Sequence, residues 1–310
     1  MRKSVFLTKG KKDMIASGQY NEYIFASPVY RFDNAVCKIL TRINVKLKLP
    51  FLVYFLGDWA KNISDYDLII CEGLKGRSWV FEYILKHKKE GCRVIMWHWN
   101  KIYENEINPK SKLAMCCEQW SFDADDCAQY NMNFNTQYYM AKEVDYDNLM
   151  KWDLYFVGND KNRMELIKKI AQYCKSTNLR GNFHVVADAS SKVSTGDEFY
   201  RKPISYEDNI KNIIHSKAIL DIPLKGQHGL TLRVLEALYF QKKLITFNSD
   251  VKNLVFYNDN NILVCHDETD IEFIVDFLQQ PYVDTEECIE ARRYYSFEEW
   301  MKRFWRLNSD

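Results

Sequence analysis

The chain has 310 residues, of which 47% are apolar and 27% charged, a composition that is typical of globular proteins and excludes a disordered chain. Its 43 basic and 42 acidic residues give a formal net charge of +1. Because nucleic-acid binding relies on an excess of basic residues, no nucleic-acid partner is expected. Aromatic residues reach 15%, which fits either stacking on ring-shaped ligands or packing in a core.

The nine cysteines include no C-x-x-C pair, so the spacing of a zinc ribbon or a redox dithiol is absent. Cys71 and Cys265 lie inside apolar runs, where cysteine usually acts as a small buried hydrophobe, and we expect reduced thiols. The basic N-terminal segment has an apolar part too short for a signal peptide. The longest apolar run, Phe51 to Leu56, cannot span a bilayer. We therefore expect a cytoplasmic protein.

Short β-branched or aromatic runs alternate with amphipathic stretches, a pattern typical of parallel sheets with crossover helices. In the first half, the expected strands are 22–25, 67–71, 93–97 and 118–122, with helices over 36–47 and 80–87. In the second half, the expected strands are 154–157, 183–187, 218–222 and 244–247, with helices over 166–174, from Ser205, over 232–240, near 270–280 and over 297–306. Capping boxes at Ser205, Thr269 and Ser296 predict three of these helix starts. The pattern predicts an α/β chain of two Rossmann-like halves that meet near residue 150.

Motifs of several nucleotide-binding and hydrolytic classes are absent. The chain has no G-x-G-x-x-G and no G-x-x-x-x-G-K-[ST], which disfavours a dinucleotide oxidoreductase and a P-loop NTPase. It also lacks G-x-S-x-G and H-E-x-x-H.

The segment 218–248 combines a strand, a loop with two glycines and a helix start. In open α/β sheets, ligands bind outside the carboxyl ends of the strands, and free N–H groups at a helix start suit a diphosphate. Arg233 adds a cationic fork, and Glu236 can accept hydrogen bonds from ribose hydroxyls. An ordinary strand–helix loop followed by a solvated Arg–Glu helix face explains the same pattern, so both interpretations stay open.

The run G-L-T-x-R-x-x-E-A-L followed by K-K-L-I-T resembles the donor-binding segment of GT-B glycosyltransferases, closest to bacterial enzymes of lipopolysaccharide and capsular polysaccharide assembly. FVGNDKNR at 156–163, WSFDADD at 120–126 and SFEEWMKRFW at 296–305 support the resemblance. It implies a GT-B fold in which residues 1–150 bind the acceptor, 151–290 bind the nucleotide sugar, and the helix in 291–310 crosses back to the first domain.

The implied activity is transfer of a sugar from a nucleotide-sugar donor to a glycan or lipid-linked acceptor in surface polysaccharide synthesis. By the resemblance, Glu236 holds the ribose, Arg233 and its neighbours surround the diphosphate, and two cations after the preceding strand neutralise phosphate charge. The implied donor-binding residues are Gly158, Lys161, Arg163, Gln227, His228, Gly229, Thr231, Arg233 and Glu236. Many retaining members carry E-x7-E, but this chain has His228 at the first glutamate position, beside Gln227. Retention and inversion therefore stay open. His228 is either a contact to sugar or phosphate, or a solvent-facing loop residue.

The first domain must supply any general base. Glu72 and His98 each follow an expected strand, and histidine has a pKa near neutrality without tuning. A helix-start carboxylate and a packed histidine are the corresponding structural alternatives. Trp97, Trp99 and Asn100 are candidates for an acceptor platform, since pyranose rings pack on aromatic side chains.

Asp123-Ala-Asp125 follows a strand, where a metal-binding D-x-D motif is found in other glycosyltransferases. Asp123 also fits a helix N-cap, a purely structural role. We expect no metal and no cofactor besides the donor substrate, with Lys161, Arg163, Arg233 and helix N-terminal amides stabilising the leaving diphosphate.

Residues 42–61 mix Lys and Arg with apolar and aromatic side chains. The stretch predicts either peripheral contact with a membrane surface or a buried helix with solvated lysines. Two other functions stay open for the whole chain: a catalytically silent nucleotide- or sugar-binding subunit, and a nucleotide-sugar epimerase of GT-B shape.

Overall fold

The computed structural model describes residues 2–8, 18–32, 34–47, 49, 51–102, 106–140, 149–191, 198–224 and 229–306. The chain divides into two compact units. Unit 1 comprises Met1–Thr136 together with Phe297–Asp310, and unit 2 comprises Gln137–Ser296. The division falls at Thr136 rather than near residue 150, and the terminal segment that belongs to unit 1 starts at Phe297.

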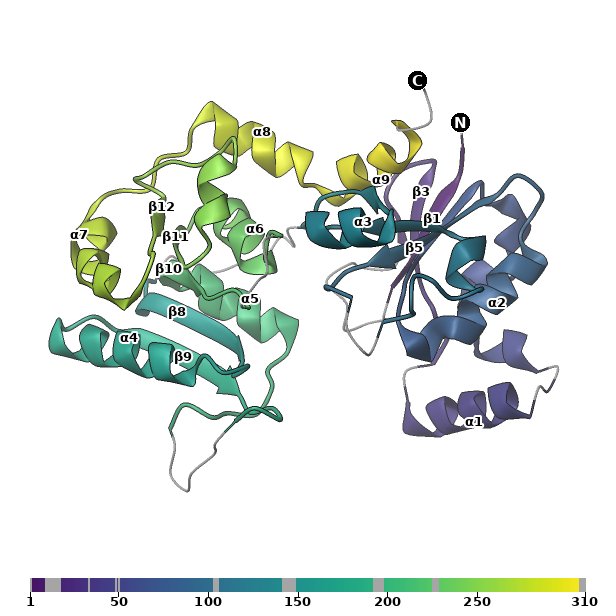
Figure 1. The fold of residues 1–310 in the computed structure, drawn as a ribbon, viewed down its shortest axis with the longest axis horizontal. Helices are drawn as coiled ribbons and strands as arrows, with labels where there is room; N and C mark the ends of the chain where they lie inside the picture. The colour runs from purple at the N-terminus through teal and green to yellow at the C-terminus, as the bar shows by residue number, and fades with distance from the viewer. Residues whose placement is uncertain are drawn as a thin grey trace. The chain divides into compact units, whose positions relative to one another are not determined.

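Unit 1 is built on one sheet with the strand order β2-β3-β1-β4-β5-β6-β7 (Figure 1). All neighbouring strands are parallel except β2, which runs antiparallel to β3. The strands are β1 (Ser4–Thr8), β2 (Gly18–Gln19), β3 (Ile24–Pro28), β4 (Leu68–Glu72), β5 (Arg93–His98), β6 (Glu118–Ser121) and β7 (Asn133–Phe134). The α-helices are α1 (Ala35–Lys46), α2 (Ser78–His87), α3 (Ala124–Tyr130) and α9 (Phe297–Arg306). Short 3₁₀ turns connect them: η1 (Leu52–Phe55), η2 (Asp58–Ala60), η3 (Ile63–Asp65), η4 (Lys75–Arg77) and η5 (Ala114–Cys116).

Helix α9 completes the core of unit 1. Its Trp300 ring lies edge-on to Phe6 of β1 at 5.7 Å and to Trp97 of β5 at 5.1 Å between ring centroids. The Trp300 indole N–H donates to the carbonyl of Thr136 at 2.7 Å, so this large ring is buried with its polar atom satisfied. The expected helix over 297–306 is thereby confirmed, and its aromatic face is covered by the strands of unit 1.

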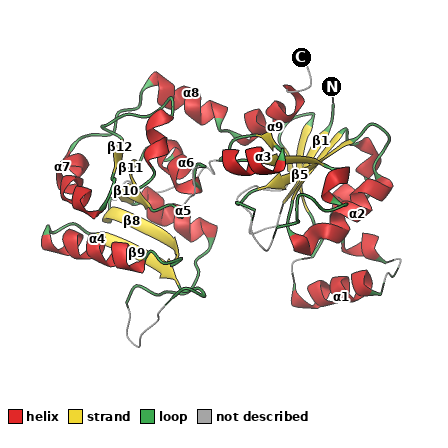
Figure 2. Ribbon diagram, viewed as in Figure 1, coloured by secondary structure: helices red, strands yellow, loops and turns green. Residues whose placement is uncertain are grey.

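Unit 2 holds a fully parallel sheet in the order β12-β11-β10-β8-β9 (Figures 1 and 2). Its strands are β8 (Trp152–Asn159), β9 (Gly181–Val186), β10 (Ser216–Asp221), β11 (Lys243–Thr246) and β12 (Ile262–Val264). The helices are α4 (Met164–Ser176), α5 (Tyr206–Ile214), α6 (Leu232–Tyr239), α7 (Ile274–Gln279) and α8 (Glu286–Tyr294), with 3₁₀ turns η6 (Ser249–Asn253) and η7 (Glu268–Phe273). Helix α4 packs against β9, and α5 and α6 pack against β10. The predicted α/β class with two parallel-sheet, Rossmann-like units is confirmed.

Two of the helix starts predicted from capping residues are capped as expected, and one is not. The Ser205 side chain accepts the N–H of Asp208, and Asp123 accepts the N–H of Asp126, so both predicted N-caps are confirmed. The capping box predicted at Thr269 is wrong. Asp267 caps this region instead, because its carboxylate accepts the N–H of Thr269 and the turn begins one residue after Asp267.

Within the described residues, no helix combines the length and the apolar character that a bilayer crossing requires.

Candidate functional site

The carboxyl edge of the unit 2 sheet contains a topological switch point. The next strand along the chain after β8 is β9, which pairs with one edge of β8. The strand after that, β10, pairs with the other edge of β8. In open α/β sheets a crevice forms outside the strands where the order reverses in this way, and ligands bind there. The residues after β8 and β10 were the predicted donor site, and the parallel pairing of these strands places both sets of residues at one edge.

Two arginines lie at this edge and hold their guanidinium groups against backbone carbonyls. Arg163 donates to the carbonyls of Asp160 at 3.1 Å, of Ile222 at 2.6 Å, and of Asn159. Arg233, one residue into α6, donates from two nitrogens to the carbonyl of Val157. Each guanidinium has five N–H groups, so these bonds leave donors on both arginines.

Gly158 allows the two guanidinium groups to lie close together. A Cβ atom at this position would come within 2.5 Å of Nη2 of Arg233 and 3.2 Å of Nη2 of Arg163. Both guanidinium groups also lie over the Phe156 ring, at 5.4 Å for Arg163 and 5.1 Å for Arg233. The glycine was predicted as a donor-site residue, and its role here is to leave room for the pair.

The two arginines at this edge lie close to each other and also close to the carboxylates of Asp160, Asp188 and Asp221. Burial, together with the neighbouring charge of Arg233, lowers the pKa of Arg163 to about 10. Asp221, fully buried at the end of β10, lies 3.5 Å from Arg233 and compensates part of this charge. A bound anion would relieve the remaining repulsion, so the arrangement suits a phosphate group.

The first turn of α6 has no side-chain cap among the described residues. Thr231 occupies the N-cap position, but its hydroxyl donates to Asp221 at 2.9 Å instead of accepting a helix N–H. A helix start without a cap keeps N–H groups for an anion. Gly229 lies just before this turn, whereas Gln227 and His228 lie outside the described residues.

Lys161 lies in the loop that joins β8 to α4. Its backbone has φ 46° and donates its N–H to Asp188 at 2.9 Å, while its side chain is exposed. The start of α4 is already occupied, because the carboxylate of Asp160 accepts the N–H groups of Arg163 and Met164 at 3.1 Å each. The anion-binding potential of this edge therefore comes from α6 and the cations and not from α4.

Glu236 faces the interior of unit 2. Its carboxyl group is 2% exposed, accepts a hydrogen bond from Asn209 at 3.0 Å, and contacts the hydroxyl of Tyr206. Burial raises its pKa to about 7. In this structure Glu236 is part of a buried polar network, and its contact with a ribose stays a prediction from the sequence.

In unit 1, Glu72 ends β4 and forms a buried ion pair. Its carboxylate lies 3.5 Å from the guanidinium of Arg77, and the two side chains are almost fully buried. Arg77 also lies 3.8 Å from the sulfur of Cys71. The carboxylate of Glu72 therefore has a structural partner in Arg77.

His98 ends the neighbouring strand β5 and forms a second buried pair. Its Nδ1 atom lies 3.4 Å from a carboxylate oxygen of Glu106, and its Nε2 atom has no hydrogen-bond partner among the described residues. The ring packs against Gly73, where a Cβ atom would lie 2.7 Å from the ring carbon Cε1. The structure thus brings Glu72 and His98 to adjacent strand ends, as the sequence predicts for cleft residues.

Trp97 is not part of an acceptor platform. It is fully buried and packs against Trp300 and Phe304 of α9, so its large apolar side chain stabilises the core. The expectation of a sugar contact at this position is wrong for that reason. Trp99 is half-buried and Asn100 is exposed at the end of the same segment.

The D-x-D candidate has structural partners. One oxygen of Asp123 caps α3, and the other lies 3.7 Å from Lys101. Asp125 is exposed and lies 3.5 Å from the same lysine. Across the part of the chain that the structure describes, no group of three or more His, Cys, Asp or Glu side chains is arranged to hold a metal.

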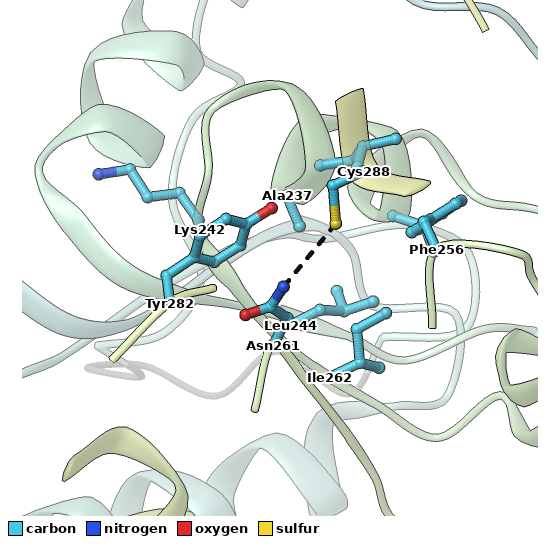
Figure 3. Close-up of a pocket in the computed structure, with 10 residues that line it drawn as sticks. Ala237, Lys242, Leu244, Phe256, Asn261, Ile262, Tyr282 and Cys288 are labelled. Atoms are coloured by element: carbon cyan, nitrogen blue, oxygen red, sulfur yellow. Dashed lines mark hydrogen bonds between the residues drawn. The ribbon is translucent and has the colours of Figure 1, made fainter. Parts of the chain in front are cut away.

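A hollow behind α6 is too small for a substrate. Figure 3 shows Lys242, Asn261, Tyr282 and Cys288 around it, with the Asn261 amide directed at the Cys288 sulfur at 3.9 Å. Its volume of about 10 Å³ corresponds to about one water molecule. The switch-point edge is therefore the better candidate for ligand binding in unit 2.

Two residues of these sites were not singled out from the sequence. Asp221 lies inside the expected strand 218–222 but was not among the predicted site residues, and neither was Glu106. An acidic residue at the carboxyl end of an apolar strand is a usable signal for Asp221. No pattern in the sequence points to Glu106. It comes to lie beside His98 through tertiary structure, in which Glu106 forms a bridge with Leu74.

Two solved structures share this fold over nearly the whole chain. HepE of Anabaena, solved in complex with UDP and glucose, aligns over 100% of this chain and 100% of its own with a TM-score of 0.52 and 10% identity. AviGT4, a glycosyltransferase involved in avilamycin A biosynthesis, aligns over 99% of this chain and 96% of its own with a TM-score of 0.50 and 13% identity.

This chain spans 54% of a chain of the glycosylation-associated Gap123 complex from Streptococcus agalactiae, with 78% of its own length aligned, 12% identity and a TM-score of 0.45. No family model and no curated protein sequence matches the chain. The structural likeness to HepE and AviGT4 shows that the chain has the GT-B fold, with two Rossmann-like units, as the sequence resemblance implied.

Proposed function

We propose that the protein is a glycosyltransferase that binds a nucleotide-sugar donor at the switch-point edge of unit 2 and transfers its sugar to a glycan or lipid-linked acceptor bound by unit 1. The observation that carries the proposal is the pair of guanidinium groups of Arg163 and Arg233 beside Gly158. In the proposed reaction, the bond from the anomeric carbon to the diphosphate breaks and a bond to an acceptor oxygen forms. The leaving diphosphate gains negative charge, which fixed cations stabilise.

The donor set we propose comprises Gly158, Lys161, Arg163, Gly229, Thr231 and Arg233. Gln227 and His228 remain sequence-based expectations for the same loop. The uncapped start of α6 adds N–H donors to the cations. Surface polysaccharide synthesis, as the sequence resemblance implies, is the proposed context.

Glu72 and His98 remain sequence-based expectations for the general base. The side chain of His98 is fully buried and the carboxylate of Glu72 is paired with Arg77, so neither group is open to an acceptor hydroxyl in this structure.

A thermal-shift comparison tests donor binding. Nucleoside diphosphates and nucleotide sugars of uridine, guanosine, thymidine and cytidine are added in turn, and a ligand that binds only the folded state must raise the Tm. We expect at least one nucleoside series to do so. A Tm unchanged by every nucleotide sugar contradicts the proposal. Interconversion of the free nucleotide sugars without transfer supports the epimerase alternative instead.

Lys161 provides the matched variant, because its exposed side chain can be removed without disturbing the fold. Lys161→Ala is expected to weaken binding of the nucleoside diphosphate about fivefold through loss of one charge partner. Lys175→Ala removes the same charge from the last turn of α4 and should leave the Kd unchanged. Equal Kd values for the two variants would remove Lys161 from the site.

We also propose that transfer proceeds without a metal. The Asp123 and Asp125 carboxylates are already engaged by the α3 cap and Lys101, and cationic side chains at the unit 2 edge perform the charge stabilisation. Turnover should persist in EDTA and should not increase when Mn²⁺ or Mg²⁺ is added. Activity that is lost in chelator and restored by metal contradicts this part of the proposal.

A further inference from the structure

Helix α1 presents its apolar side chains to solvent. Val36, Ile39, Leu40, Ile43 and Leu47, here called the apolar face of α1, are between 45% and 66% exposed. Their spacing of three and four residues places them on one side of the helix. Phe51, beside η1, is 54% exposed, and Tyr54, in η1, is 66% exposed. Figure 1 shows α1 at the periphery of unit 1.

The opposite side of α1 is polar and turned inward. Thr41 and Asn44 are 6% and 4% exposed, and the Thr41 hydroxyl donates to the carbonyl of Cys37 at 2.7 Å. The helix is therefore inverted relative to an ordinary amphipathic helix that covers a core. The sequence alternative of a buried helix with solvated lysines does not fit this orientation, because the apolar residues are the exposed ones.

The charged side chains of α1 that the structure describes are basic. They are Arg42 and Lys46, and both are exposed. By helical spacing, Arg42 and Lys46 lie between the apolar face and the inward side. A basic border around an apolar helix face is the pattern of helices that lie in the interface of an anionic membrane.

A groove beside α1 extends the basic border. It has a volume of about 640 Å³ and is lined by Arg42 and Lys46 of α1, by Lys75 of η4, and by aromatic side chains that include Tyr30 and Trp79. Glu82 is the acidic residue that lines it. Aromatic rings and basic side chains together suit the boundary between lipid headgroups and acyl chains.

We propose that α1 and η1 dock unit 1 on an anionic lipid bilayer, with the apolar face of α1 inserted at the headgroup boundary and Arg42, Lys46 and Lys75 contacting lipid phosphates. A second copy of the chain fits less well, because a two-fold interface through this face would bring the basic residues of both copies together. This docking does not depend on nucleotide-sugar binding or transfer. It goes beyond the proposed function by assigning a membrane-contact surface.

Vesicle co-flotation of the full chain tests the docking. We expect the protein to float with vesicles of phosphatidylcholine mixed with phosphatidylglycerol and to remain unbound with phosphatidylcholine alone. Combined Ile39→Gln, Ile43→Gln and Leu47→Gln should reduce the bound fraction at least tenfold, because the apolar contact is lost. Val255→Gln, at a side chain 81% exposed in unit 2, is the matched control and should bind like the wild type.

A charge variant tests the same surface independently. Arg42→Glu combined with Lys46→Glu should weaken flotation with the anionic vesicles at least tenfold, whereas Lys175→Glu with Lys252→Glu in unit 2 should not. All substituted side chains are exposed, so the Tm of each variant should equal that of the wild type.

Flotation that both α1 variants leave unchanged would overturn the proposal. So would a wild-type dimer in vesicle-free solution that the glutamine variant converts to a monomer, since the face would then belong to a second copy. Whether or not the protein binds nucleotides, the flotation and oligomeric-state measurements decide the docking proposal. Failure of docking can therefore be told apart from failure of the proposed function.

Discussion

Arg233 illustrates how one residue can combine binding and structural roles. From the sequence, a first-turn arginine is expected to be exposed and dispensable for folding. In the structure its guanidinium is only partly exposed, donates to the carbonyl of Val157 and pairs with Asp221. Its removal would leave the buried Asp221 carboxylate with less compensation. A loss of activity on substitution at Arg233 therefore does not separate binding from stability, whereas the exposed Lys161 does.

At the residue scale, the first prediction concerns the pH dependence caused by Glu236. Its pKa is raised from 4.5 in the unfolded chain to about 7 in the folded protein, so the folded state binds the proton more tightly. The stabilisation is complete below the unfolded pKa and is lost as pH rises through about 7. Between pH 5 and pH 8 we expect the free energy of unfolding to fall by about 2–3 kcal/mol from this group.

Urea unfolding at pH 5 and pH 8 measures this effect. Glu236→Gln keeps a hydrogen-bonding group of similar shape but cannot ionise, so the fall in stability attributed to Glu236 should disappear. Glu290→Gln, at an exposed position in α8, is the control and should leave the pH dependence unchanged. If the Gln variant at position 236 shows the same fall as the wild type, the carboxyl group is ionised in the folded protein and the buried network has been misassigned.

At the element scale, Asp221 joins three elements of unit 2. Its two carboxylate oxygens accept the hydroxyls of Thr231 at the start of α6 and Thr246 at the end of β11, each at 2.9 Å. Together with the nearby Arg233, these contacts fix α6 to the carboxyl ends of β10 and β11. Asp221 is therefore one of the groups that hold Arg233 and the start of α6 at this edge, together with the carbonyl of Val157.

Asp221→Ala is expected to destabilise unit 2 by about 3–5 kcal/mol, because it leaves a partly buried guanidinium and two buried hydroxyls without their acceptor. Thr246→Val removes one of the same hydrogen bonds and should cost about 1 kcal/mol. Denaturant unfolding of both variants gives the comparison. Similar small losses for the two substitutions would mean that Asp221 does not hold the start of α6.

At the scale of the whole molecule, the chain crosses between its two units twice, near Thr136 and near Phe297. Helix α9 therefore belongs to a unit whose other residues are at the opposite end of the sequence. The side chain of Trp300 and the ring of Phe6 are in contact although nearly the full length of the chain separates them. The stability of unit 1 thus depends on the last helix.

Trp300→Ala should lower the stability of unit 1 by about 3–5 kcal/mol, the usual cost of truncating a large buried aromatic side chain. In calorimetric unfolding, the transition of unit 1 should move to lower temperature, while the transition of unit 2 should stay unchanged. Ile167→Ala, in the core of unit 2, is the reciprocal control and should move the other transition. If Trp300→Ala lowers both transitions equally, the two units unfold as one.

The sequence alone determined the class of fold and most of its elements, because hydrophobic spacing and capping residues act locally. Strands 68–72, 93–98 and 216–221 and the helix starts at Ser205 and Asp123 follow directly from such patterns. Strand β1 was missed, because its apolar run is short and flanked by basic residues. Only its position between β3 and β4 in the sheet explains why Ser4–Thr8 is buried.

The tertiary structure decided which candidate residues face a ligand and which face the core. Spacing shows that Glu236 lies in a helix after a loop and that Trp97 lies in a strand. Their burial against α5 and α9 depends on other segments of the chain. The same holds for α1, whose periodicity predicts a helix but not the direction of its apolar face. Helical spacing depends on neighbouring residues alone, whereas the face that becomes buried depends on what the rest of the chain brings against it.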